Sequence, residues 1–379
     1  MRIAHITPFY HPIIGGVEEV VKRIAEHLAK KGHDVYVITY NRLRKGGKGT
    51  LPRQEEINGV HVIRLKPDIT WSHGTYSREL PKVIEKLRPD IVHVHVWRHP
   101  HVFQIAKLKR RHRFRAILHP HAPFHKLKQL GLITWLYHRA IDIFRKDVLN
   151  EYDKIIALTP YEKNILIQKL KVTKDKIDII PNAIDNELIL KAQQLKTHEE
   201  KPIILYVGRI SKSKNIHLLI KSMTYVKKEI REAKLILAGP DEGLIERILD
   251  YSRRHNIDIE YKGTVSEDRK LELYSKNKIY THPAIYEPFG ITLLEAQAFG
   301  KPCIITGNGG QLYTAPPGKT SLHAKPNPKD YAQAILRLLN DDKLYERLST
   351  NARKWAMQFT WTKILLKYEE IYNQLANKI

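Results

Sequence analysis

Residues 281–310, THPAIYEPFGITLLEAQAFGKPCIITGNGG, contain the local pattern that decides the fold. A short β-type run ends at His282, and a loop rich in proline and glycine follows it. Residues 291–299 predict a helix, which a glycine and a proline terminate before a second apolar run, Cys303 to Thr306. The order strand, loop, helix, strand is typical of an open parallel sheet, in which ligands bind where a strand gives way to a helix.

The start of this helix is a predicted phosphate site. Its first turn offers backbone N–H groups without intrahelical partners, at Gly290, Ile291 and Thr292, and the helix dipole is positive there. Two carboxylates, Glu287 in the loop and Glu295 on the helix, bracket this position with seven residues between them. Two glutamates at this spacing are usually solvated charges, but the Pro-Phe-Gly turn between them favours a site. A nucleotide-sugar, with a sugar at each end of a diphosphate, would satisfy both acids.

The segment Glu287-Pro-Phe-Gly-Ile-Thr-Leu-Leu-Glu295-Ala resembles the signature of retaining glycosyltransferases of family 4. The resemblance covers nearly the whole chain and implies an α/β protein of GT-B fold, with two Rossmann-like domains whose parallel sheets face each other across a cleft. It implies transfer of a hexose-type sugar from a nucleotide-sugar to a hydroxyl group, with retention and without a bound metal or other cofactor. By this resemblance Glu287 orients the donated sugar, Glu295 holds the ribose, and Phe289 belongs to the donor-binding segment.

Length and composition agree with two soluble domains. At 379 residues the chain is too long for one ordinary core. We predict an acceptor-side domain at 1–195, a nucleotide-sugar domain at 196–360 and a terminal helix at 361–379 that crosses back to the first domain. A polar run, Leu195 to Pro202, marks the boundary. The single cysteine, Cys303, excludes an internal disulfide and a cysteine-based metal cluster.

The net charge of +25 is concentrated in one segment. Residues 101–150 contain eleven Lys and Arg against two Asp and Glu, and an apolar stretch from Leu130 to Tyr137 with Trp135 lies among them. Basic residues beside exposed aromatics fit an anionic membrane surface, so residues 101–137 are the predicted contact; a solvated basic face is the alternative. Since no apolar run approaches the roughly 18 residues of a membrane span, we expect a cytoplasmic protein, peripheral on the inner face of the membrane.

The N-terminal half begins as half of a nucleotide-binding unit. Arg2 to Thr7 predicts a buried strand, and a helix starts near Val17 after the pair Gly15-Gly16. A glycine pair is usually only a turn. The resemblance to family 4 implies that Gly16 lets this loop approach the donor.

Histidines end two strands of this half. His93 and His95 alternate with valines in a predicted strand; they match no complete metal-ligand set, so we assign them to the core or the cleft edge. A further strand ends at His119, and the resemblance implies that His121 contacts the donated sugar. His119 and His125 are interpreted as structural.

The second half repeats the strand, glycine turn and helix pattern. Residues 203–207 predict a strand, and Gly208 to Asn215 follow it with cations ahead of a helix. Arg209 and Lys214 would clamp the diphosphate there. By resemblance, the backbone at Val265 binds the base. We expect Gly307 to Gly310 to form a flexible loop at the cleft edge, and we predict three terminal helices, at about 327–339, 342–357 and 360–377.

The sequence thus predicts a retaining glycosyltransferase whose donor carries UDP, GDP or ADP and whose acceptor is a sugar, a lipid-linked group or a small molecule. No pattern in the sequence identifies the donor base, the donated sugar or the acceptor. A sugar-nucleotide epimerase or a phosphorylase can share the architecture. A basic nucleic-acid-binding protein would explain the charge but not the two glutamates. The Lys- and Glu-rich composition with one cysteine is compatible with a thermophile.

Overall fold

The computed structural model describes residues 1–13, 15–43, 50–71, 74–121, 124, 127–195 and 202–377. Contacts divide the chain into two compact units. Unit 1 comprises Met1–Leu127, Gly131–Pro181 and Ile364–Ile379, and unit 2 comprises Lys128–Leu130 and Asn182–Lys363. His125 and most of the predicted linker after Leu195 lie outside the described residues.

Unit 1 is built on an eight-stranded sheet in the order β10-β9-β8-β7-β1-β2-β4-β3. Its strands pair in parallel except β3, which runs antiparallel to β4. The strands are β1 (Arg2–Ile6), β2 (Asp34–Tyr40), β3 (Gln54–Ile57), β4 (Val60–Leu65), β7 (Ile91–His95), β8 (Arg115–His119), β9 (Lys154–Ala157) and β10 (Ile177–Ile179). The main helices are α1 (Gly16–Lys30), α2 (Glu79–Leu87), α3 (Pro100–Lys109), α5 (Leu132–Phe144), α6 (Pro160–Gln168) and α15 (Trp361–Ala376). A separate hairpin joins β5 (Ile69–Trp71) to β6 (Gly74–Tyr76).

Side-chain alternation gives the middle of this sheet two unlike faces, because successive residues of a strand point to opposite sides. One face is aliphatic and joins the core that includes residues of α2 and α3; it carries Ala4, Val92, Val94 and Leu118. The other face carries His5, His93, His95 and His119, all fully buried. The strand register places His5 beside His93 and His95 beside His119. Unit 1 therefore has a core face made largely of imidazoles.

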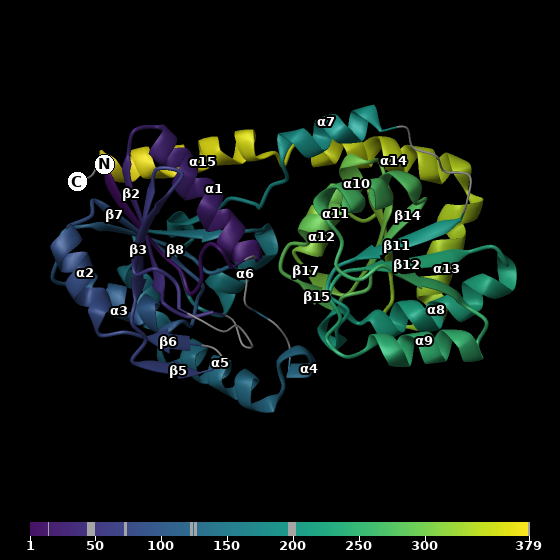
Figure 1. Ribbon diagram of the computed structural model, residues 1–379, viewed down its shortest axis with the longest axis horizontal. Coiled ribbons are helices and arrows are strands. Elements are labelled where there is room, and N and C mark those ends of the chain that lie inside the picture. Colours follow the sequence, from purple (N-terminus) through teal and green to yellow (C-terminus); the bar gives the residue numbers. More distant parts are fainter. Residues whose placement is uncertain are drawn as a thin grey trace. The chain divides into compact units, whose positions relative to one another are not determined.

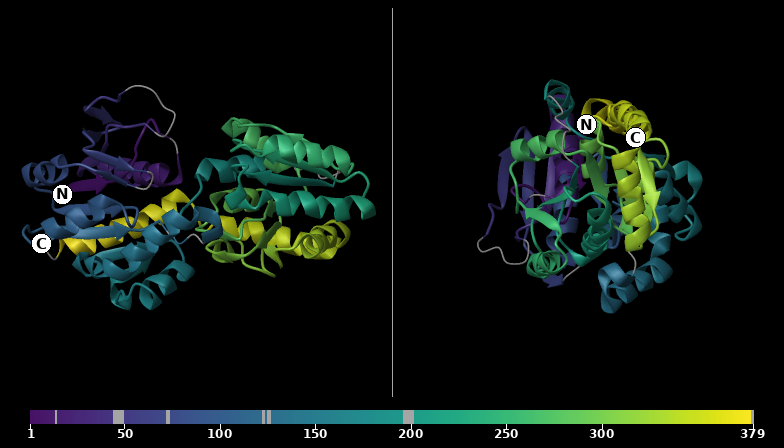
Figure 2. Two further views of the ribbon diagram at one scale, coloured as in Figure 1. Left: turned by 90° about the horizontal axis from the view of Figure 1, so that it is seen from below. Right: turned by 90° about the vertical axis from the view of Figure 1, so that its right-hand side faces the viewer.

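Helix α15 completes the histidine face. Its first residues group with unit 2 and the rest with unit 1. Tyr368 and Tyr372 are buried, with ring centroids 6.3 and 6.0 Å from that of His93. Glu369 forms ion pairs with His27 and Lys31 at the end of α1. In all views β1 begins and α15 ends on the same side of unit 1 (Figures 1 and 2).

Unit 2 contains a six-stranded, wholly parallel sheet in the order β13-β12-β11-β14-β16-β18. Helices α8, α9 and α13 lie on one face, and α10, α11 and α14 lie on the other (Figure 1). The strands are β11 (Ile203–Val207), β12 (Lys234–Ala238), β13 (Asp258–Tyr261), β14 (Ile279–His282), β16 (Cys303–Thr306) and β18 (Ser321–Ala324). The helices are α7 (Asn186–Gln194), α8 (Ile216–Glu229), α9 (Ile245–Arg254), α10 (Glu267–Lys276), α11 (Ile291–Ala298), α13 (Pro328–Asn340) and α14 (Asp342–Ala356).

The predicted α/β class and the Rossmann-like strands are confirmed, with differences at short elements. The loop expected at Gly307–Gly310 is instead partly paired: β17 (Asn308–Gly309) lies parallel to β15 (Tyr286–Glu287). Helix α7, which the sequence-based division assigned to the first domain, groups with unit 2. Two-residue strands show no alternation, so no pattern in the sequence marked them.

Acidification should destabilise unit 1 before unit 2. Burial lowers the pKa of His5 and of His121 to about 3 and lowers the pKa of His93, His95 and His119. Since the unfolded histidines titrate near 6.5, the unfolded chain binds more protons below that pH. Each neutral histidine then costs up to about 1.4 kcal/mol of unfolding free energy per pH unit.

Hydrogen exchange at pH 7 and pH 5 measures this difference. Amides of β1, β7 and β8 should lose protection at pH 5, while β11 and β12 serve as the internal control. Equal losses in both units, or none in unit 1, would contradict the prediction.

Candidate functional site

The loop between β14 and α11 holds Glu287 through its backbone. Residues Tyr286 and Glu287 pair with Asn308 and Gly309, and the Gly310 N–H donates to the Glu287 carbonyl at 2.8 Å. A Cβ added at Gly310 would lie 1.8 Å from the Pro288 carbonyl oxygen. Glycine is therefore required at this close approach, and the glycine-rich segment fixes the position of the acid.

The Glu287 carboxylate is buried and paired. It is 8% exposed, and its Oε2 accepts from Lys214 Nζ and from His282 Nε2, the latter at 3.0 Å. Burial alone would raise the pKa of Glu287, but the charge of Lys214 and the hydrogen bond from His282 outweigh it and lower that pKa well below its usual value. Glu287 is thus an anion at neutral pH. His282 Nδ1 is buried and makes no hydrogen bond to any described residue.

Lys214 reaches this acid because of the strand order. It ends a 3₁₀ turn, Lys212–Lys214, that follows β11, and β11 lies next to β14 in the sheet. The loops after neighbouring parallel strands meet at the carboxyl edge of the sheet. The structure therefore brings Glu287 and Lys214 together, as the two strand-loop-helix patterns suggested.

Arg209 lies elsewhere on the same edge. Its side chain is 59% exposed, and its Nη1 donates to Glu242 Oε1 at 2.8 Å. Glu242 belongs to the loop after β12, and the sequence had not singled it out. In this structure Arg209 and Lys214 have different acidic partners.

Glu295 lies one turn into α11 and is also engaged. Its Oε1 accepts from Lys270 Nζ at 2.9 Å and its Oε2 accepts from the Tyr274 hydroxyl at 2.8 Å, both from α10. The sequence reasoning missed Lys270 and Tyr274. Their spacing of four residues on one helix is common, so only the packing of α10 beside α11 identifies them.

The start of α11 has the geometry of an anion site. Gly290 precedes the helix with φ +87°, a left-handed conformation that favours glycine, and an added Cβ would lie 2.8 Å from Leu293 Cδ1. The backbone of Ile291 opens the first turn, where N–H groups lack intrahelical partners. The Thr292 and Tyr280 hydroxyl oxygens lie 2.7 Å apart. Phe289 is buried, with its ring centroid 6.3 Å from that of Phe359, so only its backbone is available to a ligand.

Because glycine has no side chain, the carboxyl edge of the sheet is left uncovered at Gly208 and Gly239. The Gly208 N–H donates to the Ala238 carbonyl at 2.8 Å, and the Gly239 N–H donates to the Gly263 carbonyl at 2.7 Å. A Cβ at Gly239 would lie 2.1 Å from the Gly208 oxygen. Val265, two residues beyond Gly263, is half-buried. These backbone groups border the edge on which Lys214 and Glu287 meet.

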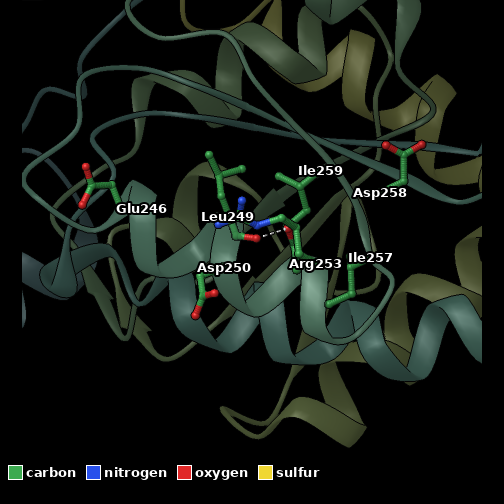
Figure 3. A pocket seen from close by; sticks show the side chains of 8 residues that line it. Glu246, Leu249, Asp250, Arg253, Ile257, Asp258 and Ile259 are labelled. Carbon is green, nitrogen blue, oxygen red and sulfur yellow. Dashed lines mark hydrogen bonds between the residues drawn. The ribbon is translucent and has the colours of Figure 1, made fainter.

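A different pocket in unit 2 lies at the start of β13, at the opposite end of the strands from Glu287. Figure 3 shows the side chains that line it. It is lined by the end of α9 and the start of β13, where the Ser252 hydroxyl donates to the Leu249 carbonyl at 2.8 Å. Glu246, Asp250 and Asp258 contribute carboxylates to its lining. These three carboxylates outnumber the one cation of the lining, Arg253, so the pocket does not suit a diphosphate.

In unit 1, His121 stands at the end of β8 in a left-handed conformation, φ +60°. It is half-buried, and its Nε2 lies 3.0 Å from His95 Nδ1. Gly16 begins α1, and a Cβ added to it would meet no described atom within 4 Å. The donor contacts predicted for His121 and Gly16 remain predictions.

The histidines of unit 1 also include two groups of three with metal-like spacing. One ring nitrogen from each of His5, His93 and His95, and likewise from His95, His119 and His121, lies within 4.8 Å of the others. Several of these rings are stacked, such as His119 on His121 at 3.8 Å and 14°. Stacked rings hold their lone pairs in parallel planes, whereas the lone pairs that bind one metal ion converge on it, so the arrangement fits hydrogen-bonded neutral imidazoles better.

The ion pair of Lys214 with Glu287 should stabilise unit 2 more than that of Arg209 with Glu242. Removing one partner of a buried pair leaves an uncompensated charge, which costs about 3 kcal/mol, whereas an exposed pair is worth about 1 kcal/mol or less. Lys214→Met and Glu287→Gln should each lower the unfolding free energy of unit 2 in urea. The double variant should recover part of the loss. Arg209→Met is the matched control, and an equal loss in that variant would contradict the prediction.

Comparison with known proteins identifies the family. The sequence model of Glycosyltransferase Family 4 matches residues 14–188, and that of Glycosyl transferases group 1 matches residues 190–355. An uncharacterised glycosyltransferase of Methanocaldococcus jannaschii is 28% identical over 98% of this chain and 98% of its own length.

Solved structures agree with the fold. Sucrose-phosphate synthase from Thermosynechococcus elongatus superposes with a TM-score of 0.79 at 25% identity, over the full length of both chains. Alr3699/HepE of Anabaena, in complex with UDP and glucose, superposes with a TM-score of 0.75 at 17% identity, over 99% of this chain and all of that one. The two family matches together span most of the sequence, and the protein belongs to glycosyltransferase family 4, as an enzyme of the GT-B fold.

Proposed function

We propose that the protein transfers a hexose-type sugar from a nucleoside diphosphate to a hydroxyl acceptor, with retention at the anomeric carbon. The observation that carries this proposal is the buried Glu287, ion-paired to Lys214 beside the first turn of α11. An anion site, a cation and a fixed carboxylate then lie on one edge of one sheet. That combination suits a diphosphate joined to a sugar.

The leaving diphosphate gains negative charge during transfer. Lys214 and the N–H groups at Gly290, Ile291 and Thr292 would stabilise that charge without a metal, by preorganised electrostatics. Arg209 would join them by exchanging Glu242 for a phosphate oxygen. The exchange is inexpensive, because an exposed ion pair contributes about 1 kcal/mol or less.

The two acids would hold the two sugars. Lys270 and Tyr274 keep Glu295 fixed, and each of its oxygens still has capacity to accept from a ribose hydroxyl. Glu287 would accept from hydroxyls of the donated sugar, with His121 as a further contact. The departing phosphate oxygen would take the proton of the acceptor, so no carboxylate needs to act as a nucleophile.

The donor is proposed to be a UDP-, GDP- or ADP-linked sugar. The HepE structure with UDP and glucose, of the same fold, supports a nucleotide-sugar of this kind. The base would be bound by backbone groups near Val265, which recognise the shape of a base more than its chemical identity.

The acceptor side is proposed to meet an anionic membrane. Within residues 101–137 several cations are already neutralised, since Lys109 and Arg115 pair with Asp153 and Arg110 pairs with Glu151. The stronger feature is α5, which has no fully buried residue. Its exposed apolar side chains are Leu132, Ile133, Leu136, Ile143 and Phe144. Arg139 and Arg145 on and beside this helix would add attraction to anionic lipid. None of the described helices is both long and apolar enough to span a bilayer.

Glu287→Gln should lower turnover about 100- to 1,000-fold, because a neutral amide orients the sugar without the charge of the carboxylate. Release of nucleoside diphosphate from a panel of UDP-, GDP- and ADP-sugars measures it. Calorimetry with the free diphosphates supplies the control: binding should survive in Glu287→Gln and fall in Arg209→Ala/Lys214→Ala. Glu242→Gln should stay active. Full activity of Glu287→Gln would refute the assignment.

Ile133→Asp/Phe144→Asp should weaken binding to phosphatidylglycerol vesicles at least tenfold in a sedimentation assay, because each aspartate removes apolar contact and adds repulsion. Ile69→Asp changes another exposed apolar residue, 61% exposed against 85% for Ile133 and 77% for Phe144, in the β5–β6 hairpin and should bind as the wild type does. Wild-type protein that ignores these vesicles, or equal losses in both variants, would exclude the membrane contact.

A further inference from the structure

Five side chains of unit 1 form one continuous hydrogen-bonded file. It starts at the half-buried His121 and runs inward through His95, His5 and Tyr372 to His93. His121 Nε2 lies 3.0 Å from His95 Nδ1, and His95 Nε2 lies 3.1 Å from His5 Nδ1. His5 Nε2 lies 3.4 Å from the Tyr372 hydroxyl, which lies 2.7 Å from His93 Nδ1. Two strands, β1 and β7, the loop after β8 and the terminal helix supply these residues.

The imidazoles of this file are neutral. Burial lowers the pKa of each of the four histidines. The described residues with charged or titratable groups around the file are His119, which stacks on His121, and Tyr368, which packs on His93 and His119. A neutral imidazole has one N–H and one bare nitrogen. At every contact one group must donate and the other must accept. The donor and acceptor at one end of the file therefore determine the tautomer of the histidine at the other end.

The contacts of Tyr372 determine this direction. O–H donors make shorter hydrogen bonds than N–H donors, with typical lengths of about 2.7–2.8 Å and about 2.9–3.0 Å. The contact of 2.7 Å to His93 Nδ1 has the length typical of an O–H donor, whereas the contact to His5 Nε2 is longer, so we assign the phenol as the donor to His93. Tyr372 then accepts, at 3.4 Å, from His5 Nε2–H. His93 Nε2 is buried and has no hydrogen-bond partner among the described residues. It would lack a partner in either direction of the file, so it does not favour the direction in which His93 donates to Tyr372.

Followed outward, the same logic reaches the surface. His5 Nδ1 is bare and accepts from His95 Nε2–H, and His95 Nδ1 is bare and accepts from His121 Nε2–H. The remaining nitrogen, His121 Nδ1, then carries a lone pair, and no hydrogen bond joins it to another described residue. The backbone of His121 is left-handed, with φ +60°. This conformation is uncommon and costly for residues other than glycine and is often found at functional positions.

We propose that this file fixes His121 in the Nε2–H tautomer, so that its Nδ1 acts only as a hydrogen-bond acceptor for a hydroxyl donor. His95, His5 and Tyr372 are then positioning residues that act through His121. The tautomer follows from the contacts alone. The identity of the ligand, a hydroxyl of the donated sugar, rests on the proposed function.

NMR of the full-length protein with ¹⁵N-labelled histidine reads the tautomer directly. Long-range ¹H–¹⁵N correlations should show His121 with a protonated Nε2 and a bare Nδ1. Tyr372→Phe removes the hydroxyl that sets the direction, so His121 should become a mixture of tautomers. Tyr368→Phe is the matched control, because its hydroxyl lies 3.5 Å from His119 Nδ1 and outside the file. It should leave His121 unchanged.

A second pair of variants is included because Tyr372→Phe alone could disturb the fold. In His5→Asn the contact with Tyr372 is lost and the amide can either donate to or accept from His95 Nε2, so His121 should become a mixture of tautomers, as in Tyr372→Phe. His5→Leu can do neither and should also give a mixture. Turnover should fall about fivefold in all three variants, with KM for the donor nearly unchanged.

The outcomes separate the claims. A wild-type His121 protonated on Nδ1, or identical spectra in the wild type, Tyr372→Phe and His5→Leu, overturns the file as the cause. Near-stoichiometric zinc, copper or nickel by elemental analysis, lost in His95→Gln, also overturns it, because a metal would occupy the lone pairs. The expected tautomer in a protein that releases nucleotide from no donor would confirm the file and refute the proposed function instead.

Discussion

The ion pair of Lys214 with Glu287 is the interaction on which the candidate site depends. A carboxylate buried to this degree would be protonated, or displaced to the surface, if no cation met it. The cation arrives from a neighbouring strand, so the acid stays charged only while β11 and β14 are adjacent. The sheet order is thus an electrostatic requirement of the site as well as a feature of the fold. Glu295 follows the same rule, with Lys270 as its cation.

Much of the architecture was readable in the sequence because its strands are long enough to show a pattern. The runs at β11 and β16 were predicted with the bounds that the structure has, and Glu287 and Lys214 were assigned to one diphosphate site because each lies where a strand gives way to a helix. Both inferences use information local to a short segment. They needed only the assumption of a parallel sheet.

The unpredicted features all join distant segments. Arg209 with Glu242, Glu295 with Lys270, and His93 with Tyr372 are separated by 33, 25 and 279 residues. Periodicity shows that a residue faces a core or the solvent, but it does not show which residue it will meet. The histidine face was the clearest case, since alternation with valine placed His93 and His95 on one side of a strand without indicating that α15 would cover them. The spacing of these histidines resembles that of a metal site. The hydroxyl of Tyr372 on α15 instead joins them in a hydrogen-bonded file with a defined direction.

The path of α15 has a consequence for how the protein is made. Unit 1 begins at the first residues of the chain, yet its imidazole face is covered by Tyr368 and Tyr372 near the last ones. A domain at the start of a chain ordinarily folds while translation of the rest continues. Here Tyr368 and Tyr372 must be synthesised before they can cover those histidines, so the first half stays incompletely packed on this face until translation has passed Tyr372.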